Sequence, residues 1–311
     1  MSEHVVYIGI DIAKVDLELS FAGKPQKSVA NTRCGIRALL RKAQKTNQPV
    51  MLCCEATGGY EKLLIGMALD QQVPIALLNP KRVRDFARSK GILAKTDKID
   101  AAVIAKYAYQ NHPVPLKEPP VWLPELQALV ARRDTLITMR KSETNRLDPE
   151  PDAVLKKSVT RIVNVLNREG GKIEEQIEAL FKTHTSLQQA SQKLQKVSSI
   201  GKVTAQALLA TVPELGTLND KQVTALVGLA PFNQDSGFMR GQRHIRGGRA
   251  QARKALYMAA VVASNHNPIL KSFYQRLKQS GKPSKVALTA VMRKLLILTN
   301  RIMADPQFVP S

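Results

Sequence analysis

The chain has 311 residues and a formal net charge of +22, from 47 Lys and Arg against 25 Asp and Glu. This excess is larger than solubility requires and favours nucleic acid as a partner over the alternative of a basic membrane surface. Residues 1–10 lack the form of a signal peptide and no apolar run is long enough to span a bilayer, so we expect a cytoplasmic protein without membrane contact.

The cysteines and the aromatic residues argue against a zinc site and against a site that binds single strands by stacking. Cys34, Cys53 and Cys54 lack the spacing of a zinc site, and we expect them to be small buried hydrophobic residues in a reducing compartment. Aromatic residues make up only 5% of the chain. Proteins that bind single strands by stacking bases on exposed rings usually carry more, so contacts to nucleic acid are expected to be mainly to phosphates.

Short apolar runs alternate with amphipathic runs in the first third of the chain. Strands are predicted at residues 5–10, 15–21, 28–31, 49–54 and 74–78, and helices at 35–43, 60–70, 81–89 and 97–109, the last capped by Thr96. Three strands followed by alternating strands and helices predict a mixed sheet with helices on its faces, in an α/β domain over residues 1–115.

Four acidic residues of this domain are candidates for one metal site. Asp11 follows the first strand, Glu55 ends the fourth, and Asp97 and Asp100 share a helix face. Their convergence would require neutralising cations, and hard carboxylate oxygens suit Mg²⁺ or Mn²⁺. Each acid also has a structural explanation: a turn for Glu55 and the helix dipole for Asp97 and Asp100. Asp11 is the hardest to explain by a purely structural role, because a charge directly after an apolar strand is poorly solvated.

The middle of the chain, residues 116–195, is predicted to be helical. Prolines between residues 113 and 124 mark a linker, and helices are expected at 125–147, at 153–168 and from 173 onward, with Gly170-Gly171 interrupting them. One apolar stripe along each helix requires a partner surface. We interpret the segment as an antiparallel coiled-coil arm for oligomerisation, and an inter-domain bundle without a role in assembly is the alternative.

Residues 196–311 are predicted to form a mainly helical domain. Residues 197–205 resemble a helix-hairpin-helix turn, although Ser198-Ser199 replaces the usual Pro-Gly. Further helices are expected at 219–227, 253–265, 268–279 and 285–303. The closing helices carry lysines and arginines that can line a nucleic-acid surface, and Ser236 to Ala304 contains no Asp or Glu.

Residues 235–249 combine one serine, several glycines and a run of arginines. Glycines let the backbone approach phosphates closely, and guanidinium groups donate two hydrogen bonds to one phosphate. The candidates for nucleic-acid contacts are Arg240, Arg243, Arg246, Arg249 and Arg253. The alternatives are a solvated basic loop for the segment and a turn serine for Ser236.

Two sets of motifs resemble those of one family. Residues 9–14 (GIDIAK), 55–60 (EATGGY), 79–80 (NP) and 95–101 (KTDKIDA) are similar to the amino-terminal domain of DEDD insertion-sequence transposases of the IS110 and IS1111 type, to which the Piv DNA invertases are related. Ser236-Gly237, Gly241, Ile245, residues 247–249, Arg253 and residues 256–257 are similar to the carboxy-terminal domain of the same family.

The resemblance implies a fold, a reaction and partners. The implied fold is RNase H-like, close to the RuvC resolvase, with the acidic tetrad on Asp11, Glu55, Asp97 and Asp100 and the serine nucleophile on Ser236. The implied reaction is excision and insertion of a mobile element through a phosphoserine link to DNA, guided by a structured bridge RNA. The implied partners are the element ends, the target DNA, the RNA and further copies of the chain, as dimer or tetramer, in the bacterial nucleoid.

Three other readings remain open. A Holliday-junction-type nuclease would use the same metal site with water as its nucleophile. A scaffold that binds nucleic acid without catalysis would need none of the acids. An actin-like sugar kinase shares the strand followed by an aspartate, but the chain lacks the later glycine-rich phosphate loops.

Overall fold

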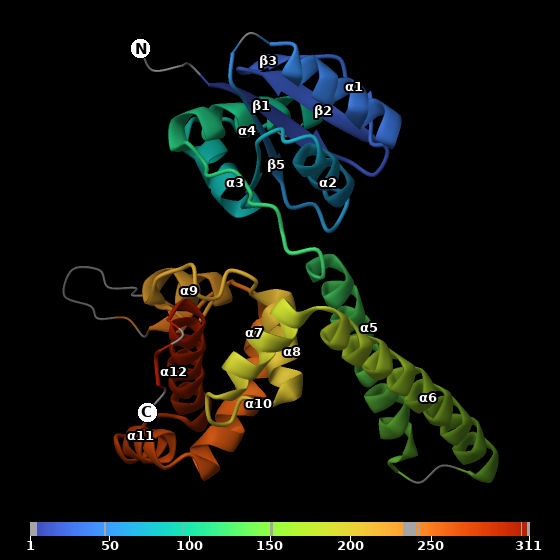
Figure 1. Ribbon diagram of the computed structural model, residues 1–311, viewed down its shortest axis with the longest axis vertical. Coiled ribbons are helices and arrows are strands. Elements are labelled where there is room, and N and C mark those ends of the chain that lie inside the picture. Colours follow the sequence, from blue (N-terminus) through green and yellow to red (C-terminus); the bar gives the residue numbers. More distant parts are fainter. Residues whose placement is uncertain are drawn as a thin grey trace. The chain divides into compact units, whose positions relative to one another are not determined.

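The computed structural model describes residues 5–46, 48–94, 96–149, 152–232, 241, 243–305 and 307–309. The chain divides into two compact units, Met1–Pro119 and Pro120–Ser311 (Figure 1). The division falls within the predicted proline linker. None of the helices in the described ranges combines the length and the apolar character needed to cross a membrane.

The first unit is built on the predicted mixed sheet. Its strands are β1 (Val6–Ile12), β2 (Asp16–Phe21), β3 (Lys24–Pro25), β4 (Val29–Ala30), β5 (Val50–Glu55) and β6 (Ile75–Leu78). The order across the sheet is β3-β2-β1-β5-β6, and β4 also pairs with β2. The pairs β1–β2, β2–β3 and β2–β4 are antiparallel, whereas β1–β5 and β5–β6 are parallel.

Helices cover both faces of this sheet, as Figure 1 shows. The helices are α1 (Arg33–Gln44), α2 (Lys62–Asp70), α3 (Pro80–Ser89) and α4 (Asp97–Asn111). Because side chains alternate along a strand, Ile8 and Ile10 pack in one core with α1 and α2, and Tyr7 packs in another with α3 and α4. Thr96 caps α4 as predicted, since its Oγ1 accepts a hydrogen bond from the Ile99 backbone N at 3.3 Å.

The cysteines of the first unit do not all behave alike. Cys53 and Cys54 on β5 are buried, and burial raises the pKa of the Cys53 thiol to about 12. Cys34 is exposed, and the expectation that it is buried was wrong. It stands in the first turn of α1, whose buried face carries Ile36, Leu39 and Leu40.

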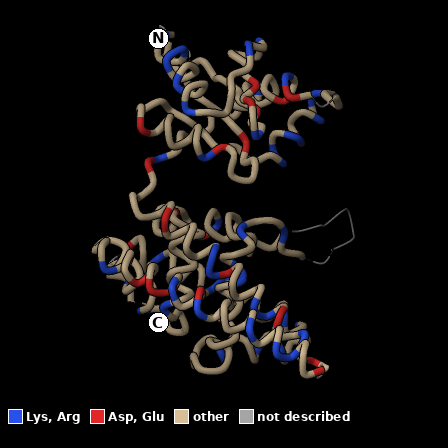
Figure 2. The backbone as a smooth tube through the Cα atoms, turned by 90° about the vertical axis from the view of Figure 1, so that its right-hand side faces the viewer, with Lys and Arg blue, Asp and Glu red and all other residues tan. Residues whose placement is uncertain are grey.

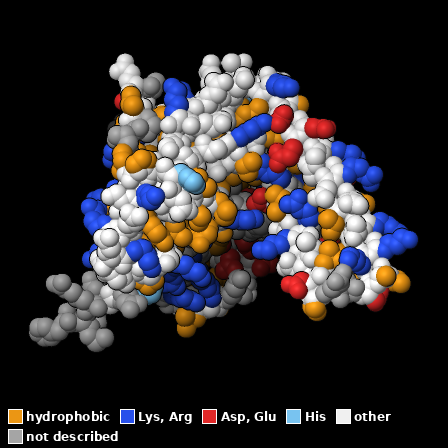
Figure 3. Space-filling model, turned by 90° about the horizontal axis from the view of Figure 1, so that it is seen from below, with side chains coloured by type: hydrophobic (Ala, Val, Ile, Leu, Met, Phe, Trp, Pro, Cys, Tyr) orange, Lys and Arg blue, Asp and Glu red, His pale blue; other side chains and the backbone are white. Residues whose placement is uncertain are grey.

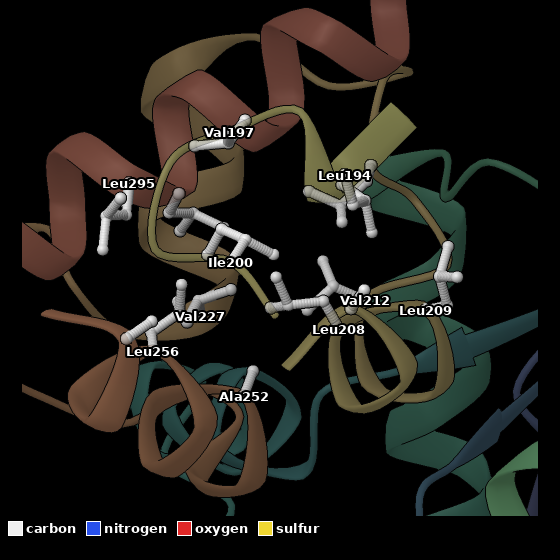
Figure 4. Packing of buried hydrophobic residues seen from close by; sticks show 14 of the residues in the cluster. Leu194, Val197, Ile200, Leu208, Leu209, Val212, Val227, Ala252, Leu256 and Leu295 are labelled. Atoms are coloured by element: carbon white, nitrogen blue, oxygen red, sulfur yellow. The ribbon is translucent and has the colours of Figure 1, made fainter. Parts of the chain in front are cut away.

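The second unit is helical. It contains α5 (Leu123–Thr144), η1 (Asn145–Leu147), α6 (Ala153–Thr183), α7 (Thr185–Gln195), α8 (Lys202–Thr211), α9 (Asp220–Val227), α10 (Ala250–His266), α11 (Pro268–Gln279) and α12 (Ser284–Ala304). A short ribbon of β7 (Pro231–Phe232) and β8 (His244–Ile245) lies between α9 and α10 in sequence. Figure 4 shows Leu208, Val227 and Leu256 among the side chains of its core, to which every helix from α5 to α12 contributes.

Helices α5 and α6 form an antiparallel pair, seen extended in Figure 1. Arg133 Nη1 lies 3.4 Å from Glu174 Oε1, and Arg140 Nη1 donates to Asn167 Oδ1 at 3.1 Å. The predicted interruption at Gly170-Gly171 was wrong, because α6 is one continuous helix of 31 residues. A glycine costs a helix about 1 kcal/mol, and packing against α5 on both sides of the pair outweighs that cost.

Candidate active site

The sheet places Asp11 and Glu55 at the ends of adjacent strands. Ile10 and Cys54 are the last residues paired in the parallel β1–β5 ladder, and Asp11 and Glu55 follow them directly. Both acids are half-buried. By strand alternation both lie on the face that carries Tyr7 and Cys53, which α3 and α4 cover. Two of the four predicted acids are therefore neighbours in the sheet.

A third carboxylate, which the sequence analysis missed, stands beside them. Glu18 on β2 is directly opposite Asp11 in the antiparallel β1–β2 ladder and is half-buried. Like charges opposite each other in a sheet repel unless a counter-charge lies between them. The signal was available in the alternation of Leu17, Glu18 and Leu19, because a hairpin that buries both leucines turns Glu18 to the face of Asp11.

Helix α4 runs antiparallel to β1 on this face. A Cβ on Gly9 would lie 2.1 Å from the Ala101 carbonyl oxygen and 2.5 Å from the Ala105 backbone N, so strand and helix are in close contact. At the other end of α4 the Tyr7 hydroxyl lies 3.0 Å from His112 Nδ1. Moving along β1 from Tyr7 to Asp11 therefore leads toward the first turn of α4.

That first turn carries Asp97 and Asp100. Asp97 is exposed and Asp100 is half-buried, and they stand four residues before the buried Ala101 and Ile104. Because residues four apart lie on one helix face, the two aspartates continue the face that α4 turns to the sheet. All four predicted acids are thus found at one end of the first unit.

The side chains as they stand do not form a closed metal site. Within the described ranges, no three or more His, Cys, Asp or Glu side chains are gathered so as to hold one metal ion. The donor chemistry nevertheless fits a divalent cation, because Asp11, Glu18 and Glu55 offer hard oxygens on three adjacent strands. The structure brings Asp11 and Glu55 together in the sheet and Asp97 and Asp100 together on the helix.

The turn after Glu55 is held by another residue that the sequence analysis missed, Glu61. Its Oε2 accepts hydrogen bonds from Thr57 N at 3.1 Å, Thr57 Oγ1 at 3.1 Å and Gly59 N at 2.9 Å. Burial opposes ionisation of this carboxyl group, but the hydrogen bonds outweigh it and lower the pKa of Glu61. Glu61 therefore fixes the loop that leaves the strand end at Glu55.

Ser236 and Arg240 lie outside the described residues, but the structure describes both ends of the segment that carries them. Pro231 pairs with Ile245 and Phe232 pairs with His244 in the antiparallel β7–β8 ribbon. Arg243 and Arg246 are exposed at this ribbon. The predicted serine and two of the predicted arginines thus belong to one segment whose ends are paired.

Two glycines hold the base of this segment by direct backbone contact. Gly228 has φ +79° and Gly248 has φ +74°, both in the left-handed region. A Cβ on Gly228 would lie 2.1 Å from the Gly247 carbonyl oxygen, and one on Gly248 would lie 2.3 Å from Gly228 N. Any side chain at either position would separate the end of α9 from the start of α10.

Arg249 and Arg253 make protein contacts at the same place. Arg249 pairs with both carboxylate oxygens of Glu214, with Nη2 to Oε1 at 2.6 Å, and its Nη1 donates to the Thr211 carbonyl at 2.9 Å. Arg253 Nη1 donates to the Val227 carbonyl at 2.9 Å and to the Gly247 carbonyl. In this structure both side chains therefore brace the segment, and the exposed Arg243 and Arg246 are better placed to reach nucleic acid.

Substituting Gly248 by alanine is expected to destabilise the second unit by roughly 2–4 kcal/mol, because the methyl group meets backbone and the left-handed φ is unfavourable. The matched control is Gly171→Ala, where an added Cβ meets nothing within 4 Å. That change is expected to stabilise α6 by up to about 1 kcal/mol. Thermal unfolding of both variants checks this, and equal midpoints for Gly248→Ala and the wild type would disprove the contact.

Comparison with known proteins assigns both regions to one family. Residues 8–150 match the model of the DEDD transposases of IS110, described as Transposase, and residues 191–275 match that of the Transposase IS116/IS110/IS902 family. The first match contains all four predicted acids and the second contains Ser236 and the arginines. Together the two matches span most of the chain.

Individual relatives agree with this assignment. The chain is 28% identical to a pilin gene-inverting protein of Moraxella bovis over 315 residues, which cover 96% of this chain and 95% of that protein. It is 24% identical to the transposase of insertion sequence element IS1111A of Coxiella burnetii over 271 residues, covering 74% and 70% of the two chains. The chain therefore belongs to the IS110 family of transposases and is an enzyme of DNA recombination.

Proposed function

We propose that this protein is the recombinase of an insertion sequence, which cuts and rejoins DNA through a covalent bond between Ser236 and a DNA phosphate. The observation that carries the proposal is the sheet register, which sets Asp11 beside Glu55 at the end of the unit where α4 begins. A second segment of the same chain, matched to the same family, supplies the serine.

The arrangement of the first unit supports an RNase H-like fold. Strands β1 to β4 pair antiparallel, β5 and β6 extend the sheet from β1 in parallel, and helices lie on both faces of the sheet. Acids then stand on the central strand β1 and at the end of its parallel neighbour β5. This is the placement that the resemblance to the RuvC resolvase implies.

A divalent cation, Mg²⁺ or Mn²⁺, would be held by Asp11 and Glu55 together with Asp97 and Asp100. When bound, such a cation neutralises charge on the phosphodiester. The protein's own groups carry the rest: the Ser236 oxygen attacks phosphorus and loses its proton, and the bond to the 3′ oxygen breaks as that oxygen gains one. Arg240, Arg243 and Arg246 are the candidates to balance the developing charge.

The phosphoserine bond makes the reaction reversible. Attack by another 3′ hydroxyl on the same phosphorus releases Ser236 and joins a new pair of strands. Because one phosphate ester replaces another at each step, no ATP is required. Retention of the phosphate ester distinguishes the proposed recombinase from a nuclease, which hydrolyses the phosphodiester bond with water.

The test is a search for the covalent intermediate. The full-length protein is incubated with DNA of the element's ends, the element's RNA and Mg²⁺, denatured and digested with nuclease and protease. Mass spectrometry is expected to find a nucleotide joined to the peptide that contains Ser236. An adduct on another residue, or none in protein that completes strand transfer, overturns the serine mechanism.

A metal-dependent junction nuclease is the second candidate. The observation in its favour is that all four predicted acids belong to the first unit, so a metal site there needs no residue of the second. Water would then replace Ser236 as nucleophile. The two candidates differ in the product, which is a rejoined strand for the recombinase and a free 5′ phosphate for the nuclease.

We also propose that a bridge RNA guides the enzyme to its DNA. Lys and Arg occur along both units in Figure 2, and Figure 3 shows several groups of them on one face. With a net charge of +22 and few aromatic residues, the chain suits contacts to the backbones of RNA and DNA. If guidance is correct, omitting the RNA abolishes joining at the target, and changing its sequence redirects it.

Self-association through α5 and α6 completes the proposal. Val154, Leu155, Ile162 and Val165 are exposed apolar residues of α6. Residues 153–168 of this helix carry Lys and Arg without an acid, and residues 169–183 carry four glutamates. Two antiparallel copies would set each basic half against an acidic half.

The arm is tested by Ile162→Glu with Val165→Glu, which buries charge in the proposed interface. Sedimentation is expected to show monomers where the wild type forms dimers or tetramers. Val309→Glu is the control, since Val309 is 81% exposed and lies far along the chain from the arm. An unchanged oligomer in the double variant contradicts this role of the arm.

A further inference from the structure

A cavity of about 720 Å³ lies in the first unit at the end of β1 opposite to Asp11. It is bounded by the start of β1, the end of α3 and the last turns of α4. Tyr7, which lines it, precedes Asp11 by four residues, or about 13 Å along a strand. The cavity is therefore distinct from the acids, and its volume is in the range of roughly 300–1,000 Å³ that ligand pockets have.

Aromatic rings are concentrated at this cavity. Only 5% of the residues in the chain are aromatic, yet Tyr7, Phe86 and Tyr109 all line it. Tyr109 is 61% exposed and lies edge-to-face with the buried Tyr7, with centroids 6.3 Å apart. An exposed ring braced by a buried one offers a face on which a flat heteroaromatic group can stack.

Positive charge and amide groups stand at the rim. Lys90 and Lys106 are both exposed lining residues, and Lys90 Nζ lies 5.7 Å from the centre of the Phe86 ring. Gln48 and Gln110 add side-chain amides. The sequence of α3, which leads to Lys90, contains Lys81, Arg82, Arg84 and Arg88 against a single acid, Asp85. An anion approaching along α3 would reach the cavity over an electropositive surface.

We propose that this cavity takes one unpaired nucleotide of a strand bound to the enzyme, with its base against Tyr109 and its phosphates near Lys90 and Lys106. Rings, cations and amides match the three parts of a nucleotide: the face of the base, the phosphate and the polar edge of the base. Neither Ser236 nor the acids take part, so the inference stands whether or not the serine mechanism is correct. The strand is DNA or RNA, since both present the same groups.

Photo-crosslinking locates the nucleotide. Short single-stranded DNA containing 4-thiothymidine and the matching RNA containing 4-thiouridine are each irradiated with the full-length protein and digested with trypsin. The crosslink is expected in the peptide of residues 107–117, which contains Tyr109. Crosslinks confined to peptides of the second unit, with both probes, overturn the proposal.

Affinity measurements with the same probes test the two contacts separately. Tyr109→Ala and Lys106→Gln are each expected to weaken binding about ten-fold for the strand that uses the site, and Tyr109→Phe to restore it. Lys117→Gln, which removes an exposed charge outside the cavity lining, controls for loss of overall charge. A loss with DNA, RNA or both supports the site and names its strand, whereas unchanged affinity for both in a variant that still folds rejects it.

Discussion

Strand transfer by the Ser236→Ala variant is expected to fall by roughly 10⁴-fold or more, because removing the proposed covalent nucleophile leaves only binding and charge stabilisation. The DNA-linked adduct disappears with it. DNA affinity is expected to stay near that of the wild type, since a hydroxyl supplies little of the phosphate contact that arginines provide. Labelled DNA of the element's ends, resolved on a denaturing gel, measures joined and cleaved strands together.

The comparison variant is Ser158→Ala, which removes an exposed serine from α6. It is expected to transfer strands at the wild-type rate. Cleavage that persists in Ser236→Ala while joining is lost would point to water as the nucleophile and favour the nuclease. Joining that persists would remove Ser236 from the mechanism altogether.

Asp11→Asn is expected to lower strand cleavage by about 10³-fold or more. The activity falls because the variant loses one of the proposed ligands of the cation that would neutralise charge on the phosphodiester. Cleavage assays with and without Mg²⁺ measure the effect, and thermal unfolding of the variant shows whether its fold is kept.

Asp16→Asn is the matched control, since Asp16 is exposed at the start of β2 and is paired with Ala30 rather than with an acid. Neither activity nor stability should change. A purely structural role for Asp11 predicts instead that the metal-free variant loses stability along with its activity. Glu18→Gln tests whether Glu18 takes part in catalysis. If Glu18 only repels the neighbouring acids, the variant is more stable than the wild type and fully active.

Local sequence patterns predicted most elements of the fold. The apolar run of β1, the alternation of β2 and the Thr96 cap of α4 are properties of neighbouring residues, and the structure confirms these elements within one or two residues. The mixed sheet with helices on both faces was also predicted correctly. The break predicted at Gly170-Gly171 was wrong because the prediction used the low helix propensity of glycine and took no account of α5, which packs against α6 and stabilises it.

Features of the site that depend on distant residues were missed. Glu214 precedes Arg249 by 35 residues, and no local pattern reveals that this arginine is paired with protein. Glu18 required the register of a hairpin, and Glu61 required the path of the turn after Glu55. The four predicted acids could be singled out because each stands at or near the end of a helix or strand.

The contact between Gly9 and α4 has a consequence for the reach of the acids. The backbone of Ala101 occupies the space in which residue 9 would carry a side chain. The side chain of a larger residue would clash with α4 and push its first turn away from the strand, which would move Asp97 and Asp100 away from Asp11. The distance between the two pairs of predicted acids therefore depends on residue 9 having no side chain.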